Sequence, residues 1–297
     1  MKRAMIYSII LVVVLLLGWQ GYEFWVAVGR QPRGERLERC KQSPQWRNGK
    51  FVNVHDTPTL TSDAGFFGQM YKFLFGKVRN LRPDKNVPTV HTSLKDIPRT
   101  EEVCVWLGHS TIYLQTGGVR FLIDPILTNQ LPVWWFMRPF KGAAVYTVDD
   151  IPEVDYLLIT HDHWDHLDYP SVMALKPKVK HVLCPLGVGE YFEQWGFDAK
   201  KIIEHDWDSV IELGNGLTAH ILTSQHFSGR MLKQNPTEWC SFAFITPQLK
   251  IFCSGDGGYG DHFKDIGQRF NGFDLALMEN GQYNERWHNI HLMPEET

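Results

Sequence analysis

Ten residues in the middle of the chain, ITHDHWDHLD (159–168), contain three histidines and three aspartates at the end of an apolar run. The run before them, DYLLIT (155–160), is short and apolar, so we predict a buried strand whose carboxyl end carries this polar loop. Asp168 and Pro170 follow, which is typical of a helix start with a capping carboxylate and a proline in the first turn. A strand, a polar loop and a helix in this order form an arrangement on which binding and catalytic sites are often built.

The loop is rich in potential metal ligands. Four of them lie within six positions: His161, His163, Asp165 and His166. Imidazole nitrogens and carboxylate oxygens are the ligands that zinc and other first-row divalent cations take. A solvated loop that merely contains many His and Asp residues is the alternative, but so many ligating groups repel one another and resist ordering unless a cation offsets both effects. We therefore predict that the loop binds metal, a motif-level prediction that needs its structural context.

The composition is that of one globular domain with a sizeable core. The chain has 297 residues, of which 43% are hydrophobic and 21% charged, and its formal net charge is -3. The 30 Lys and Arg residues are dispersed rather than concentrated in one tract, so no nucleic-acid partner is expected, although a nuclease is not excluded. The five cysteines are odd in number and include no CxxC motif, which suggests neither a disulfide framework nor a zinc knuckle.

The amino terminus is almost wholly apolar over residues 4–19, and the aromatic stretch YEFW (22–25) follows. This pattern predicts a signal segment or a membrane anchor over residues 1–30. Neither a small-x-small cleavage motif nor a lipid-accepting cysteine follows it, which favours an uncleaved anchor over a signal peptide or a buried core helix. Lys2 and Arg3 favour a cytoplasmic amino end and export of the rest of the chain, while the arginines at 30, 33, 36 and 39 oppose it. We expect an anchored protein on the exported side.

The rest of the chain divides into two parts. Residues 31–100 are polar and interrupted by prolines, with one amphipathic patch at 65–75, and we expect a linker and lead-in segment there. Strands and helices alternate over residues 101–297, which predicts one α/β domain. Four strand ends in that domain carry His or Asp: Asp124, the loop above, His226 and Asp256, the last inside a glycine cluster that lets the backbone approach a ligand closely.

At this point the chain resembles the metallo-β-lactamase superfamily. The HxHxDH motif at 161–166 and the segments WLGHST, FLIDP, QHFSGR and GDGGYG are similar to the branch that contains N-acylphosphatidylethanolamine-hydrolysing phospholipase D and its bacterial relatives. The resemblance runs from about Val103 to Glu296 and implies a four-layer αββα sandwich with two divalent metal ions at one edge of its sheets. Zinc is favoured over manganese or iron. The ligands that the resemblance implies are His161, His163 and His226 for the first metal, Asp165 and His166 for the second, and Asp256 as the bridge between them.

The chemistry expected of such a site is hydrolysis. Two metals about 3.5 to 4 Å apart lower the pKa of a shared water, so that a metal-bridging hydroxide attacks while the metals stabilise the developing charge. Asp165 and Asp256 take part through the metals. His109 and His291 are candidates for binding substrate or assisting the leaving group, with a structural role equally open for each. Asp124 is expected to orient a ligand imidazole by a hydrogen bond, or else to stabilise a turn.

The substrate is indicated by an aromatic stretch, LPVWWFMRPFKG (131–142). Trp134 and Trp135 could bind acyl chains and Arg138 a phosphate, but a loop packed onto the domain is the alternative. A membrane anchor favours a lipid substrate because it raises the local enzyme concentration at the bilayer. We expect a phosphodiesterase of the phospholipase D type that acts on N-acylated phospholipids or similar lipids. A lactone or other ester hydrolase, or a metal-binding envelope protein with a degenerate site, are the alternatives, and a homodimer is left open.

The last residues, IHLMPEET, indicate the opening of a helix, with Pro294 followed by Glu295 and Glu296. One turn cannot sustain a helix, because most of its stability comes from packing. The resemblance implies a further strand-end histidine as a ligand of the second metal, and the sequence has no residue at that position. We therefore expect a chain whose C-terminal part is missing, with the first metal held more tightly than the second and hydrolysis weak or absent, unless His288 or His291 takes the place.

Overall fold

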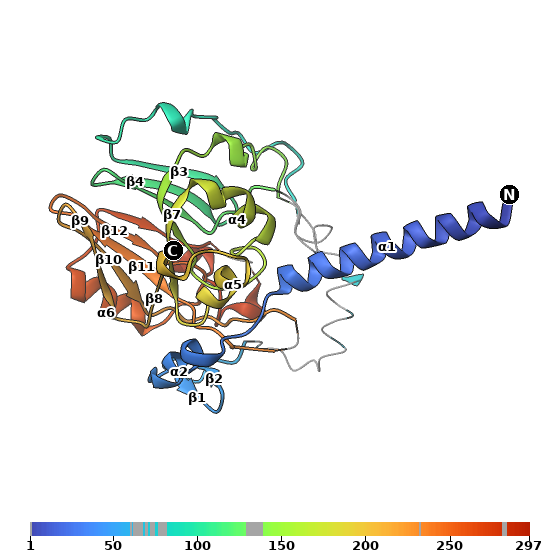
Figure 1. The fold of residues 1–297 in the computed structure, drawn as a ribbon. Coiled ribbons are helices and arrows are strands. Elements are labelled where there is room, and N and C mark those ends of the chain that lie inside the picture. Colours follow the sequence, from blue (N-terminus) through green and yellow to red (C-terminus); the bar gives the residue numbers. More distant parts are fainter. Residues whose placement is uncertain are drawn as a thin grey trace.

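The computed structural model describes residues 2–59, 61, 68, 71, 75–76, 82–128, 139–231, 233–280 and 284–297. A long helix projects from the body of the molecule, and a short helix with a two-stranded hairpin follows at its base (Figure 1). Their bounds are α1 (Lys2–Val28), α2 (Gly34–Gln42), β1 (Trp46–Arg47) and β2 (Lys50–Phe51). Within the segment 31–100, Cys40 and Phe51 are fully buried and pack in the core of the domain. The amphipathic patch predicted at 65–75 lies mostly outside the described residues.

Six strands form the first sheet in the spatial order β3-β4-β5-β6-β7-β8. Their bounds are β3 (Val103–Gly108), β4 (Thr111–Thr116), β5 (Val119–Ile123), β6 (Val154–Leu158), β7 (Val179–Pro185) and β8 (Ile202–His205). The first three pair antiparallel, and β5 to β8 pair parallel. Gly117 and Gly118 form the β4–β5 turn with φ of 56° and 76°, values that a two-residue hairpin turn demands and that glycine adopts without strain.

Five strands form the second sheet in the order β13-β12-β11-β10-β9. Their bounds are β9 (Val210–Gly214), β10 (Leu217–Leu222), β11 (Ser241–Ile245), β12 (Lys250–Cys253) and β13 (Leu275–Leu277). All neighbours pair antiparallel except β12 and β13, which are parallel. All strands of the first sheet therefore precede those of the second along the chain, and each sheet forms a separate layer.

The two sheets pack face to face, and helices cover their outer faces. Phe121 of the first sheet and Phe244 of the second lie in one buried cluster between the sheets, with ring centroids 4.7 Å apart. Val172 of α4 (Tyr169–Leu175) and Phe192 of α5 (Gly189–Gln194) bury against the other face of the first sheet. Ile266 of α6 (Asp261–Phe270) does the same on the second sheet. The result is the four-layer αββα sandwich that the resemblance implied.

The helix starts follow the sequence signals. Asp168 caps α4, because its carboxylate accepts a hydrogen bond from Ser171 N at 3.1 Å, and Pro170 occupies the first turn. The predicted opening at Pro294 is a 3₁₀ turn. The described 3₁₀ helices are η1 (Leu94–Asp96), η2 (Val148–Asp150), η3 (Lys176–Lys178), η4 (Ala199–Lys201), η5 (Glu285–Trp287) and η6 (Pro294–Glu296).

Helix α1 is long and apolar enough to cross a membrane. The stretch Met5–Val28 has a mean hydropathy of 1.9, and no part of its most apolar window is buried in the domain. A helix of this length covers the hydrocarbon thickness of a bilayer. By length and composition, this helix near the amino terminus could anchor the protein in a membrane or serve as a signal sequence.

Candidate metal centre

The loop after β6 carries four of the predicted ligands. Strand β6 pairs in parallel with β5 on one side and β7 on the other, so its carboxyl end opens at the sheet edge where α/β proteins bind ligands. The loop turns back on itself, because His166 N and Leu167 N both donate to His163 O, at 3.1 and 2.9 Å. His163 and His166 stand at the two ends of this turn, so the loop can supply ligands to two neighbouring groups.

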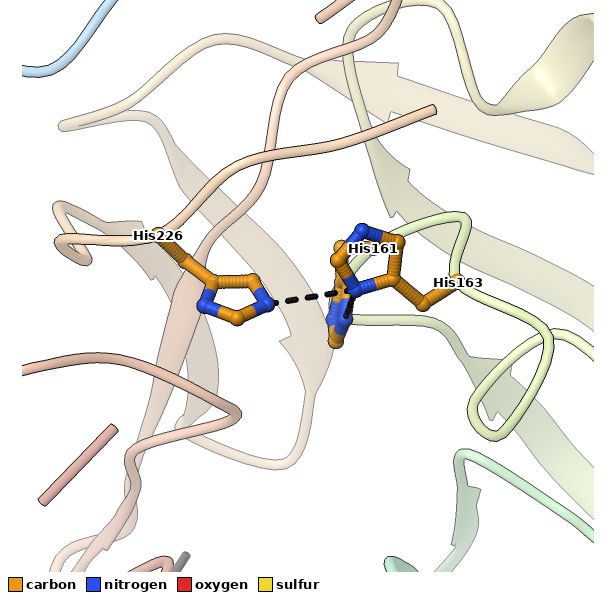
Figure 2. A group of neighbouring side chains, drawn as sticks. All are labelled: His161, His163 and His226. Atoms are coloured by element: carbon orange, nitrogen blue, oxygen red, sulfur yellow. Dashed lines mark hydrogen bonds between the residues drawn. The ribbon is translucent and has the colours of Figure 1, made fainter. Parts of the chain in front are cut away.

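Three histidines form the first group (Figure 2). His161 Nε2 and His226 Nε2 lie 2.9 and 3.2 Å from His163 Nδ1. His226 comes from the loop after β10, so the group joins the edges of both sheets. Burial, aided by the neighbouring imidazoles, lowers the pKa of His161 and of His226 well below the usual value, which keeps both rings in the neutral form that ligates metals.

Asp256 lies between two further sets of ligands. His166 Nε2 is 3.2 Å from Asp256 Oδ2. The ligand atoms of His161, His166 and Asp256 lie within 4.8 Å of one another, and so do those of His226, Asp256 and His291. Burial raises the pKa of Asp256, but the His166 imidazole outweighs this effect and holds the pKa well below its usual range. An ionised carboxylate shared by two sets of ligands fits a position between two cations.

Asp124 contacts the ring of His166 from the end of β5. Its Oδ2 accepts from His166 Nδ1 at 2.8 Å and from Thr160 Oγ1 at 2.6 Å, while its Oδ1 accepts from Thr160 N at 2.8 Å. A proton on Nδ1 leaves Nε2 with a free lone pair for a cation. The contact with Nδ1 can orient the His166 ring. The contacts with Thr160 join the ends of β5 and β6, so the same carboxylate can also stabilise the turn after β5.

The backbone of His226 is clamped by Asn53, a residue that sequence reasoning missed. Asn53 Nδ2 donates to His226 O at 2.8 Å, and Asn53 Oδ1 accepts from His226 N at 3.1 Å and from Trp239 Nε1 at 3.0 Å. The His226 ring donates from Nδ1 to Ile290 O at 2.8 Å. A single asparagine after a two-residue strand carries no signal of this role in the sequence.

Two of the residues that we expected to contact substrate, His109 and His291, lie beside the ligand groups. His109 follows β3 with φ of 47° and its Nε2 lies 3.1 Å from Asp165 Oδ2, and these two residues form a compact set with His166. His291 Nδ1 lies 3.2 Å from Glu279 Oε1 and 3.7 Å from Asp256 Oδ2. Both histidines therefore border the ligand groups. The remaining candidates, Trp134, Trp135 and Arg138, lie outside the described residues.

A cavity of about 700 Å³ opens beside the ligand groups. Its lining includes side chains already described: His109, Asp124, Asp165, His166, Asp256 and His291. Apolar side chains line the rest, among them Trp106 and Ile112 from the first sheet and Leu277 and Met278 from the end of β13. Its size is that of a pocket for a small molecule or part of a lipid, and Asp165 and Asp256 are among the residues that line it.

Comparisons with known proteins agree with this geometry. A family model described as a beta-lactamase superfamily domain matches residues 119–297. The chain is 34% identical over 265 residues to an uncharacterised protein of Mycobacterium tuberculosis, covering 86% of this chain and 69% of that protein. It is 30% identical over 280 residues to N-acyl-phosphatidylethanolamine-hydrolyzing phospholipase D 1 of Caenorhabditis elegans, covering 84% and 76%. It is also 62% identical over 81 residues to the outer membrane protein RomA of Klebsiella pneumoniae, covering 27% and 61%.

Proposed function

This chain belongs to the metallo-β-lactamase superfamily, and from that premise we propose that it is a phosphodiesterase of the phospholipase D type that acts on N-acylated phospholipids or similar lipids. Membership of the superfamily makes it a hydrolase, and its His and Asp clusters could bind metal. The observation that carries this proposal is the cavity, whose lining combines residues of the ligand groups with apolar side chains. A phosphodiester with acyl chains needs both.

Two divalent cations, with zinc favoured, would occupy the two groups of ligands. His161, His163 and His226 would hold the first, Asp165 and His166 the second, and Asp256 would contact both. When bound, such a pair supplies an activated water and stabilises negative charge on the ester oxygens. The chain itself keeps its ligands ready: the buried rings of His161 and His226 are neutral, and Asp124 orients His166.

His109 and His291 are the residues best placed to assist the leaving group. Each borders the cavity and lies next to a carboxylate of the ligand groups, Asp165 for His109 and Asp256 for His291. An imidazole in such a position can donate a hydrogen bond to a bound ester oxygen or transfer a proton to the departing alcohol. The contact with Glu279 holds the His291 ring in one orientation.

A lactone or other carboxylic ester is the second candidate substrate. Among the described residues that line the cavity there is no Lys or Arg, although a phosphate is often bound by such cations. A neutral ester would not require one. Arg138, which we expected to contact a phosphate, lies outside the described residues, so the two substrates are best separated by experiment.

The location that we propose is a membrane, with the catalytic domain on its exported side. Helix α1 is apolar along its length, and the Klebsiella relative over 81 residues is named an outer membrane protein. Protease treatment of intact cells, of cells with only the outer membrane opened and of fully lysed cells would test the sidedness. We expect the protease to cleave the domain once the outer membrane has been opened. Cleavage that requires full lysis, which exposes the cytoplasm, would contradict the proposed exported location.

Turnover by the full-length protein in detergent micelles tests the function. After zinc loading, we expect hydrolysis of an N-acylated phospholipid to phosphatidate and free N-acylethanolamine, with little action on a short lactone. The double variant His161→Ala/His163→Ala should lose zinc and turnover together. His205→Ala, which removes an exposed histidine at the end of β8, serves as the control and should keep both.

The other outcomes separate the alternatives. Turnover of the lactone alone would replace the phosphodiesterase by an ester hydrolase. Zinc binding without turnover of either substrate would favour a binding protein with a degenerate site. An unchanged zinc content in the double variant would show that the ligand assignment is wrong.

A further inference from the structure

Arg230, the last residue of the QHFSGR segment, is a buried arginine beneath the metal-binding loop 161–167, with 5% of its surface exposed. Its Nε donates to Asp162 O at 2.6 Å, and its Nη2 donates to Leu167 O. These two carbonyl groups bracket the ligands His163, Asp165 and His166. One guanidinium group therefore fixes both ends of the loop that supplies most of the metal ligands.

The third donor of the same guanidinium binds helix α1. Arg230 Nη1 donates to Ala27 O, one of the last carbonyl groups of the helix, which have no partner within it. A cation at this end also interacts favourably with the helix dipole. Because the last turn of α1 contains no basic residue of its own, Arg230 supplies this charge from the domain.

Other contacts hold the end of α1 against the same loop. Trp195 Nε1 donates to Val26 O at 2.9 Å. The ring of Phe24 stacks on Trp164, inside the metal-binding loop, at 6.2 Å between centroids. Gly29 has φ of 76°, and a Cβ there would lie 2.1 Å from the Tyr191 ring, so only glycine permits this close approach. The helix end is thus seated on the domain rather than attached by a loose linker.

Aromatic rings enclose the arginine between helix and loop. Its guanidinium carbon lies 4.3 Å from the centre of the Trp164 ring and 5.0 Å from that of Tyr191, within the range of cation–π attraction. Tyr191 in turn donates to Asp162 Oδ2 at 2.7 Å, and Gly229 N donates to Asp162 Oδ1 at 2.6 Å. The partners of Arg230 named here lie in α1, lie in the metal-binding loop, or contact one of these two segments.

We propose that Arg230 is a positioning residue that couples the seated end of α1 to the metal-binding loop. Seating of α1 and binding of the cations then strengthen each other by the same factor, because coupling between two equilibria is reciprocal. The proposal rests on the metal centre proposed above and is independent of the substrate.

Cobalt titration of the full-length protein in detergent micelles tests the proposal. We expect Arg230→Met to weaken Co²⁺ binding about 10–100-fold, as is usual when a group that positions metal ligands is removed, and to change the visible absorption of the bound ion. Arg230→Lys keeps the charge and should recover part of the affinity. Trp195→Phe removes the bond to Val26 O, keeps an aromatic ring at this buried position, and should shift affinity in the same direction. Arg269→Met, whose guanidinium pairs with Asp208 at the surface, is the control.

Hydrogen exchange of residues 24–30 provides the reciprocal measurement. Zn²⁺ should slow exchange there in the parent protein and have no such effect in Arg230→Met. Unchanged Co²⁺ affinity and absorption in a folded Arg230→Met protein would overturn the proposal. If that variant does not fold, unchanged affinity in both Arg230→Lys and Trp195→Phe would overturn it instead. A parent protein that binds Co²⁺ without turnover would refute the proposed function alone, and one that binds no Co²⁺ would refute the metal centre and the coupling together.

Discussion

Replacing Asp124 by asparagine should weaken the binding of the cation that His166 ligates while leaving the fold intact. The backbone at Asp124 has φ of 46°, a conformation that asparagine tolerates as well as aspartate. The side chain keeps its shape, so the substitution removes the negative charge and replaces one acceptor oxygen by an amide nitrogen. An amide nitrogen in place of Oδ2 would face His166 Nδ1 and force the ring proton onto Nε2, the atom nearest Asp256. A nitrogen in place of Oδ1 would face the Thr160 N–H, donor against donor.

The size of the effect follows from these contacts. Either orientation loses one hydrogen bond to a charged acceptor, which is worth about 1.5–3 kcal/mol. Removal of the outer partner of a ligating histidine usually lowers metal affinity about 10–100-fold, which corresponds to about 1.4–2.8 kcal/mol. The two ranges agree. The cation held by the three-histidine group should be affected less, because Asp124 reaches His161 only through Thr160 Oγ1, 3.0 Å from His161 Nδ1.

Competition of the full-length protein with a zinc chelator at neutral pH measures both affinities. Asp155→Asn is a matched control, since this carboxylate on β6 pairs with Arg99 and Lys180 and contacts no candidate ligand. We expect one weakened site in Asp124→Asn and none in the control. Two unchanged affinities in folded Asp124→Asn would refute the view that this carboxylate orients His166.

Three further predictions concern stability and can be checked by thermal unfolding. Asn53→Ala leaves the His226 backbone without its clamp, so it should lower the free energy of unfolding by about 1–3 kcal/mol and reduce the stabilisation by Zn²⁺; an equal response to Zn²⁺ would contradict it. Burial, together with the Asp206 carboxylate, raises the pKa of Glu238 well above that of an exposed glutamate, so the associated stability is present below the ordinary pKa and is lost as pH rises through the folded-state pKa. Glu238→Gln should therefore raise Tm at pH 8 but not at pH 4, and an equal gain at both would be inconsistent with this reasoning. Removal of metal with EDTA should lower Tm, because ligands that bind only the folded state stabilise it, whereas His161→Ala/His163→Ala should show little response.

The parts of the site that the sequence predicts are those set by local pattern. The run DYLLIT, the loop after it and Asp124 at the next strand end could be placed because the carboxyl ends of neighbouring parallel strands share one edge. The alternation of strands and helices predicts one α/β domain, whereas the four-layer αββα arrangement was implied by the family resemblance.

The parts that escaped prediction depend on contacts between distant positions. Asn53 binds His226 across 173 positions, and Arg230 binds Ala27 across 203. Neither pairing leaves a trace in the local pattern, because an asparagine after a short strand and an arginine after a glycine are common in any loop. The family resemblance did not supply them either, since it extends from about Val103 and both partners in the amino-terminal region precede that residue.

The exposure of α1 affects how the size of the protein is measured. Among the residues that the structure describes, those in contact with the domain lie near the last turn of the helix, and side chains such as Leu11 and Leu15 are about 60% exposed. Apolar surface of this extent does not remain in contact with water, and a bilayer, a micelle or another copy of the helix must cover it. In detergent-free solution, scattering or gel filtration would therefore report how many helices have gathered together, and a mass above that of one chain would carry no information on whether the αββα domains themselves associate.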